Sequence, residues 1–107
     1  MRDFSDDLKE VSRRLLEASG YLKIEQQRER FRELEVEISR PDLWDDQDLA
    51  KRLNAEYANA KGDIDTFDAL SRQLEDAEVL HELAREVDDA SQEPDIEAAI
   101  ASLKPVL

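Results

Sequence analysis

The pattern of apolar residues predicts one very long helix over residues 45–87. In this stretch apolar or small residues recur at alternating steps of three and four positions, which keeps them on one stripe of a helix. A helix of this length measures roughly 60 Å at about 1.5 Å per residue, so other helices must lie along it to bury the stripe. The stripe comprises Ala50, Leu53, Tyr57, Ala60, Ile64, Phe67, Ser71 and Leu74, and it drifts onward through Ala77, Leu80, Leu83, Ala84 and Val87.

Two amphipathic segments before this stretch predict helices over residues 5–18 and 22–39. Ser5 is a good N-cap for the first, because its side-chain oxygen can accept from a free backbone N–H group. The two apolar stripes are out of phase by two residues, so we expect a kink or break near Gly20. The first stripe comprises Phe4, Leu8, Val11, Leu15 and Ala18, and the second Ile24, Gln27, Phe31, Leu34 and Ile38.

A proline-containing corner separates the second helix from the long one. Arg40 precedes Pro41, and a proline disfavours helical backbone angles in the residue before it. Asp45 is expected to cap the long helix, and so short a corner makes the two helices antiparallel neighbours. Leu43 and Trp44 are expected to pack under the end of the bundle.

These elements predict an all-α fold, an antiparallel helical bundle built along one long central helix. The last helix is expected over residues 94–104, with Pro94 in its first turn. Gly62 falls opposite the stripe of the long helix and is expected to face solvent, at a cost of about 1 kcal/mol relative to alanine. The chain is expected to form a single helical domain over residues 1–107.

Composition limits the function classes. The chain has 40% charged residues, which allows disorder as a competing interpretation, but the apolar periodicity argues against it. Cysteine is absent, so neither a disulfide framework nor a thiolate metal site is expected. No apolar run reaches membrane-spanning length and no signal-peptide pattern opens the chain, so a cytoplasmic location without membrane contact is expected.

The net charge of −13 is unevenly distributed. Residues 1–60 carry 11 basic and 15 acidic side chains, whereas residues 61–107 carry 4 basic and 13 acidic ones. Wrapping of nucleic acid around the whole domain is disfavoured, because such binding depends on neutralising phosphates. Contact with RNA would need a local basic face in the first half, and the second half suits a basic patch on a protein.

Catalytic and metal-binding chemistry is not expected. His81 is the only histidine, so a structural or surface role is favoured. The run Asp63–Asp68 superficially resembles a calcium loop but lacks the glycine at its sixth position and the terminal glutamate. No glycine-rich phosphate loop and no supported serine nucleophile is visible, so we expect no cofactor, no metal and no enzyme activity.

A candidate partner-binding set lies in the second helix and the corner that follows it. Its cations either form a solvated face with helical ion pairs such as Glu25–Arg28, Glu29–Arg32 and Arg30–Glu33, or contact RNA or an acidic surface. The tryptophan is either a packed corner residue or a partner anchor. The set consists of Arg28, Arg32, Arg40 and Trp44.

Several short sequence motifs show a resemblance to a known family that the apolar periodicity alone does not reveal. The stretches that carry it are Gly20-Tyr21-Leu22, Arg32–Glu37, Arg40–Asp46, Gln73–Asp76, Leu80, Glu82–Ala84 and Glu86–Asp89. Together they resemble the N-terminal helical domain of the bacterial peptide chain release factor 2 family, which belongs to the class-one release factors. The most specific part is Pro-Asp-Leu-Trp-Asp in the corner.

The resemblance implies a factor that terminates translation at UGA and UAA stop codons by promoting peptidyl-tRNA hydrolysis. The family's codon-reading Ser-Pro-Phe and catalytic Gly-Gly-Gln motifs are absent, so no catalytic residue is carried over. A fragment of a longer protein is therefore expected, with the remaining release-factor domains following Leu107. In the family this domain approaches the stalk base of the large ribosomal subunit, which implies ribosome docking. Lys23 stands where many family genes encode Asp at a programmed frameshift, so that regulation is not implied here.

A freestanding helical scaffold is the alternative. The three-four spacing from Leu53 to Leu74 serves a self-associating coiled coil as well as an intramolecular bundle. A tight dimer at low micromolar concentration would favour the scaffold, whereas a monomer or a weak homodimer fits a release-factor fragment.

Overall fold

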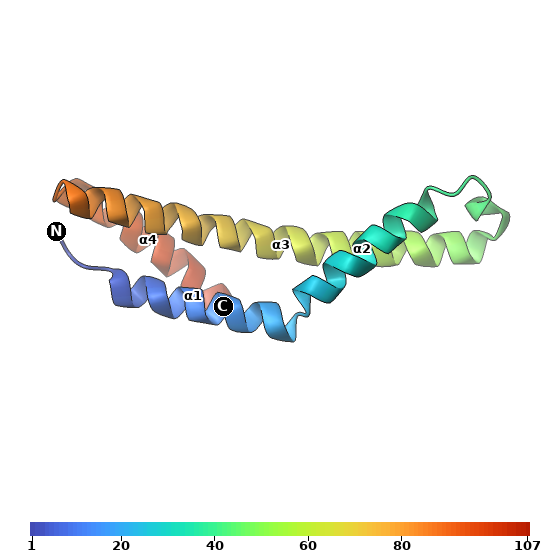
Figure 1. Ribbon diagram of the computed structural model, residues 1–107, viewed down its shortest axis with the longest axis horizontal. Helices are drawn as coiled ribbons and strands as arrows, with labels where there is room; N and C mark the ends of the chain where they lie inside the picture. The colour runs from blue at the N-terminus through green and yellow to red at the C-terminus, as the bar shows by residue number, and fades with distance from the viewer. The chain divides into compact units, whose positions relative to one another are not determined.

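The computed structural model describes residues 1–107 and consists of helices joined by short turns (Figure 1). The predicted all-α fold class with one long central helix is confirmed, because α3 alone contains 40 residues. The α-helices are α1 (Ser5–Tyr21), α2 (Ile24–Ile38), α3 (Gln47–Glu86) and α4 (Glu93–Leu103), and the short 3₁₀ helices are η1 (Leu43–Asp45), η2 (Ala90–Gln92) and η3 (Lys104–Val106).

The chain divides into two compact units, and α3 contributes to both. The first unit comprises Met1–Tyr21 and Asp68–Leu107, and the second comprises Leu22–Phe67. The expectation of a single domain over residues 1–107 stays a prediction.

The first unit contains α1, the C-terminal part of α3 and α4. Every member of the predicted α1 stripe is buried, because its spacing of three and four residues turns one face of the helix inward. Ile96 and Leu103 of α4 are fully buried, and Pro94 lies in the first turn of that helix as predicted.

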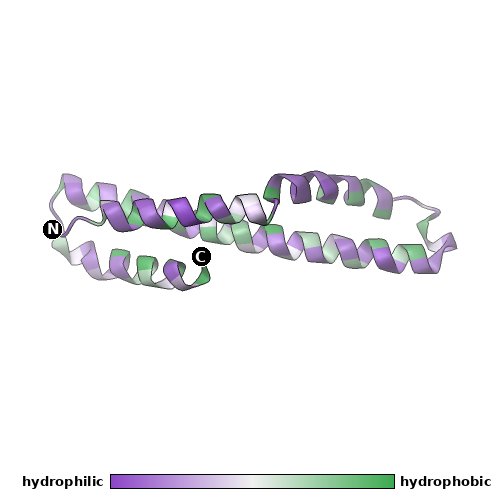
Figure 2. Cartoon of the chain, turned by 90° about the horizontal axis from the view of Figure 1, so that it is seen from below, coloured by the Kyte–Doolittle hydropathy of each residue, from purple (hydrophilic) through white to green (hydrophobic).

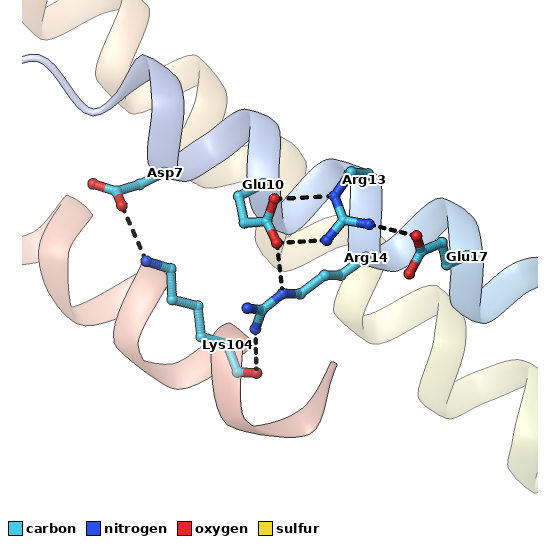
Figure 3. Close-up of polar contacts among 6 residues, drawn as sticks. All are labelled: Asp7, Glu10, Arg13, Arg14, Glu17 and Lys104. Carbon is cyan, nitrogen blue, oxygen red and sulfur yellow. Dashed lines mark hydrogen bonds and ion pairs between the residues drawn. The ribbon is translucent and has the colours of Figure 1, made fainter.

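Polar contacts tie α1 to the end of α4 in the first unit (Figure 3). Lys104 Nζ donates to Asp7 Oδ1 at 3.0 Å, and Arg14 Nη1 donates to the Lys104 carbonyl oxygen at 3.4 Å. Arg14 Nε and Arg13 Nη2 both donate to Glu10 Oε1, at 3.0 and 2.6 Å. The carboxylate of Glu10 therefore holds two guanidinium groups, one of which reaches the end of α4.

The second unit is formed by α2, η1 and the N-terminal part of α3. Phe31 of α2 stacks on Tyr57 of α3 with ring centroids 4.7 Å apart and an interplanar angle of 17°. The predicted antiparallel arrangement of these two helices is present (Figure 1). Its core comprises Leu34, Leu43, Ala50 and Leu53, with Ile38, Leu49 and Tyr57 packed against it.

The break between α1 and α2 lies after the position that the sequence indicated. Gly20 remains helical, and Lys23 takes the left-handed conformation instead, with φ 53° and ψ 49°. Left-handed backbone normally favours glycine. The break predicted near Gly20 is therefore present, and it lies at Leu22 and Lys23, between the end of α1 and the start of α2.

Two predicted helix caps are wrong by one or two residues. Asp46 caps α3, because its carboxylate Oδ1 accepts from the Leu49 N–H at 3.1 Å, whereas Asp45 belongs to η1. Ser5 is the first residue of α1 rather than its N-cap, and Asp3 Oδ1 accepts from the Ser5 N–H at 2.9 Å. In both cases the capping carboxylate lies just outside the helix, where the backbone is still free to turn.

The buried stripe of α3 also departs from its predicted course in the first unit. Leu83 and Val87 are exposed, with relative exposures of 56% and 73%. The predicted positions Leu74, Ala77 and Ala84 are buried, and together with His81 they keep the three-four spacing. Of these four residues only His81 lies outside the predicted stripe, because that stripe was defined by apolar and small residues. Gly62 is exposed within α3, as expected.

Candidate partner-binding surface

The four predicted partner-binding residues all lie in the second unit, in two groups. Arg28 and Arg32 are one turn apart on α2. Arg40 follows the end of α2, and Trp44 belongs to η1. The Leu43 N–H donates to the Arg40 carbonyl oxygen at 3.2 Å, which folds the corner back and brings the second group together.

The arginines differ in exposure. Arg32 and Arg40 are exposed, and neither forms an ion pair within the chain. Arg28 is half-buried and interacts with other residues of the chain. Arg32 and Arg40 are therefore the better-presented cations, and a guanidinium can bind a phosphate or carboxylate through two parallel hydrogen bonds.

Arg30 is directed toward α3 and is not part of this surface. Its Nε and Nη2 atoms donate to the two carboxylate oxygens of Glu56 at 2.7 and 3.0 Å, and Nη1 donates to Glu33 at 3.2 Å. The hydrogen bond to Arg30 holds the pKa of the Glu56 carboxyl below its usual value. The sequence predicted the contact with Glu33, but it did not predict the inter-helix pair with Glu56, which depends on the register of α2 against α3.

Trp44 does not pack under the end of the bundle, so that expectation is wrong. Leu43 is buried with 6% exposure, whereas the adjacent Trp44 is 59% exposed. A 3₁₀ helix has three residues per turn, so successive side chains point about 120° apart. Because Leu43 enters the core of the second unit, Trp44 is directed away from it.

The corner also carries acidic side chains, which limit what this surface can bind. Asp42, Asp45 and Asp46 are exposed near Trp44. The second unit as a whole has 8 basic and 12 acidic side chains, a balance of −4. Hydrophilic residues dominate the visible length of α2 (Figure 2). The arrangement suits local contacts to a few phosphates or carboxylates around one exposed aromatic ring, rather than a broad electrostatic interface.

The other candidate chemical groups have structural explanations. Nε2 of His81 accepts from the Phe4 N–H at 3.0 Å, and the histidine is buried with 5% exposure. Asp63–Asp68 is helical, so it does not form a calcium-binding loop. No group of three or more histidine, cysteine, aspartate and glutamate side chains could hold a metal ion. None of the helices has the length and apolar character needed to cross a membrane.

The chain belongs to the PCRF domain family, which matches residues 27–106. This match includes most of α2, the whole of α3 and α4, and all four candidate residues, whereas α1 lies before it.

Within that class, the chain is similar to proteins named peptide chain release factor 2. It is 44% identical to the one from Nocardia farcinica over 82 residues, which are 77% of this chain and 22% of the relative. It is 34% identical to the one from Aliivibrio fischeri over 100 residues, 94% of this chain and 27% of the relative. The Exiguobacterium protein is 32% identical over 102 residues, 95% of this chain and 28% of the relative. The resemblance to the helical domain of the release factor 2 family is confirmed, and the chain spans about a quarter of the length of these relatives.

Proposed function

We propose that this chain is the ribosome-docking domain of a factor that terminates translation at UGA and UAA stop codons. The observation that carries the proposal is the 44% identity to a peptide chain release factor 2 over 77% of the chain. The factor would act in the cytoplasm, where its remaining domains, C-terminal to Leu107, would read the codon and promote peptidyl-tRNA hydrolysis. The domain itself would contribute binding and no catalytic residue.

The surface proposed for docking is formed by Arg32, Arg40 and Trp44, with Arg28 beside them. Arg32 and Arg40 are exposed cations, and Trp44 presents an exposed ring that can stack on a base or fill a pocket of a protein partner. We propose the stalk base of the large ribosomal subunit as the partner. Its phosphates or acidic side chains would accept from the two guanidinium groups.

The test is peptide release from ribosomes with the full-length gene product. Release is expected at UGA and UAA and not at UAG, and release also at UAG would overturn the codon assignment. Deleting residues 1–107 is expected to raise the factor concentration needed for half-maximal release. Unchanged recruitment and rate after the deletion would overturn the docking role.

Point variants then test the surface itself. Arg32→Glu and Trp44→Ala are each expected to weaken recruitment about tenfold, as truncation of an interface hot spot does. Lys51→Glu is the matched control, because Lys51 is an exposed cation of α3 in the same unit. Equal losses in the control and in Arg32→Glu would assign the effect to net charge rather than to this surface.

The freestanding scaffold is disfavoured by the burial of the stripe that it would use. Leu53 is 8% and Leu74 is 4% exposed within the single chain, so neither is available to a second copy. Analytical ultracentrifugation separates the two proposals. A monomer or a weak homodimer agrees with the docking domain, and a tight dimer at low micromolar concentration would favour the scaffold.

A further inference from the structure

An apolar stripe on α3 in the first unit is exposed to solvent. Val79, Leu83 and Val87 follow one another at steps of four residues and are 55%, 56% and 73% exposed. Val79 and Leu83 lie on the same side of α3, because they are four residues apart, and Val87 comes directly after the last residue of the helix. Val79 and Leu83 lie on the side of α3 opposite His81, which is directed into the core.

A groove between α3 and α4 adjoins this stripe. It has a volume of about 270 Å³ and is mainly apolar, and small side chains on both helices leave it open. Asp76 lies at its edge and is three residues before Val79, so groove and stripe meet on one face of α3. The groove is lined by Gln73, Asp76, Ala77, Leu80, Ala99 and Ser102. We call the stripe and the groove together the α3–α4 face.

The charges around the α3–α4 face are predominantly negative. The first unit carries 7 basic and 16 acidic side chains, a balance of −9. Arg85 does not offset the charge at this face, because its Nη1 atom donates to Ser5 Oγ at 3.2 Å on the α1 side. The acidic residues that flank the stripe are exposed, and they are Glu75, Asp76, Glu82 and Glu86.

This combination favours one class of partner. An RNA phosphate backbone would be repelled by the carboxylates. A second copy of the chain would bring an identical acidic rim against this one, so self-association through the face is opposed. A partner with apolar side chains along one helical stripe and lysine or arginine beside them would match both the groove and the rim.

We infer that the α3–α4 face binds a basic amphipathic helix of another protein. An apolar side chain of that helix enters the groove beside Leu80, others pack along Val79 and Leu83, and its cations lie against the flanking carboxylates. This inference concerns the first unit and does not rest on the docking function proposed for Arg32, Arg40 and Trp44.

The test is titration of the 107-residue chain with synthetic peptides. Calorimetry and the NMR amide resonances of the chain monitor the binding. The probe is a peptide of about 15 residues with leucine at helical three-four spacing and lysine elsewhere. It is expected to bind with shifts of the α3–α4 resonances. A peptide with every leucine replaced by alanine is expected to bind about tenfold more weakly, because it keeps the charge but loses the apolar contact.

Two chain variants without a charge change locate the binding. Leu83→Ser is expected to weaken binding of the leucine–lysine peptide about tenfold. Leu16→Ser is the matched control, since Leu16 of α1 is 75% exposed and is expected to leave binding unchanged. Circular dichroism verifies that both variants keep their helix content.

Three results would overturn the inference. Equal affinity for the alanine–lysine peptide would mean that net charge alone attracts the probe. Equal weakening by Leu16→Ser and Leu83→Ser would place the binding elsewhere. Binding of a single-stranded RNA that Leu83→Ser weakens would assign the face to a nucleic acid instead.

Discussion

The imidazole of His81 and the backbone of Phe4 are joined by a hydrogen bond in which Nε2 accepts from the Phe4 N–H at 3.0 Å. The two rings also meet edge to face, with centroids 5.8 Å apart. Both residues are buried, with exposures of 5% and 1%. The contact fixes the start of α1 against α3 in the first unit.

Replacing His81 with leucine is expected to destabilise the chain by about 1–3 kcal/mol, because the buried Phe4 N–H loses its acceptor. His81→Gln is the matched variant and is expected to lose less stability, since the side-chain carbonyl oxygen of glutamine can still accept the hydrogen bond from the Phe4 N–H. Urea unfolding followed by far-ultraviolet circular dichroism measures both. Equal stability of His81→Leu and the unmodified chain would contradict the role of this hydrogen bond.

Truncating two adjacent side chains of the corner is expected to change the stability of the chain by very different amounts. Leu43→Ala should cost about 2–5 kcal/mol, because it removes a buried side chain from the core of the second unit. Trp44→Ala should change the free energy of unfolding by less than about 0.5 kcal/mol, because most of the ring is exposed. Thermal and urea unfolding of the two variants provide the comparison, and a large loss in Trp44→Ala would show that the ring is packed.

Lys23→Gly is expected to stabilise the chain by roughly 0.5–1 kcal/mol. The left-handed conformation costs an L-residue roughly 1–2 kcal/mol. Glycine avoids this cost, but its more flexible unfolded state offsets part of the gain in stability. Lys23→Ala removes the same charge but keeps a Cβ atom, so it should give no such gain. The φ of 53° at this position predicts that order of stability, and the reverse order in denaturant titrations would contradict it.

Acid is expected to weaken the fold as the Glu10 carboxylate becomes protonated. Hydrogen bonds from Arg13 and then Arg14 lower the pKa of Glu10 from its ordinary 4.5 to about 2. Because the folded pKa is the lower one, the unfolded chain binds the proton first. The stabilisation from Glu10 is therefore complete above about pH 4.5 and is lost as the pH falls toward 2.

Unfolding temperatures measured across this interval test the effect. Glu10→Gln should flatten the pH dependence relative to the unmodified chain. Glu35→Gln, an exposed glutamate on α2, should leave the slope as it is. Added salt should also reduce the slope, because these ion pairs are open to solvent. An unchanged slope in Glu10→Gln would show that other carboxylates govern the acid response.

The sequence by itself determined the helices and most of their buried faces. The apolar steps of three and four residues in α1, α2 and the first part of α3 are local properties, since a helix turns about 100° per residue whatever surrounds it. Proline at residue 41 likewise ended α2 in the predicted place, because its ring acts on its immediate neighbour. The exposed positions of Arg32 and Arg40 agree with both interpretations that the sequence leaves open, a solvated face and a partner-binding surface.

Only the tertiary structure decided which of two equivalent local choices is used. It placed Leu43 rather than Trp44 in the core, because one 3₁₀ turn can direct only one of the two side chains inward. It made His81 part of the buried stripe, because the N–H of Phe4, 77 positions earlier, satisfies the ring nitrogen there. It also directed Arg30 to Glu56 and left Leu83 in solvent. These outcomes depend on which elements pack against one another, and the apolar periodicity of one helix contains no information about the elements that pack against it.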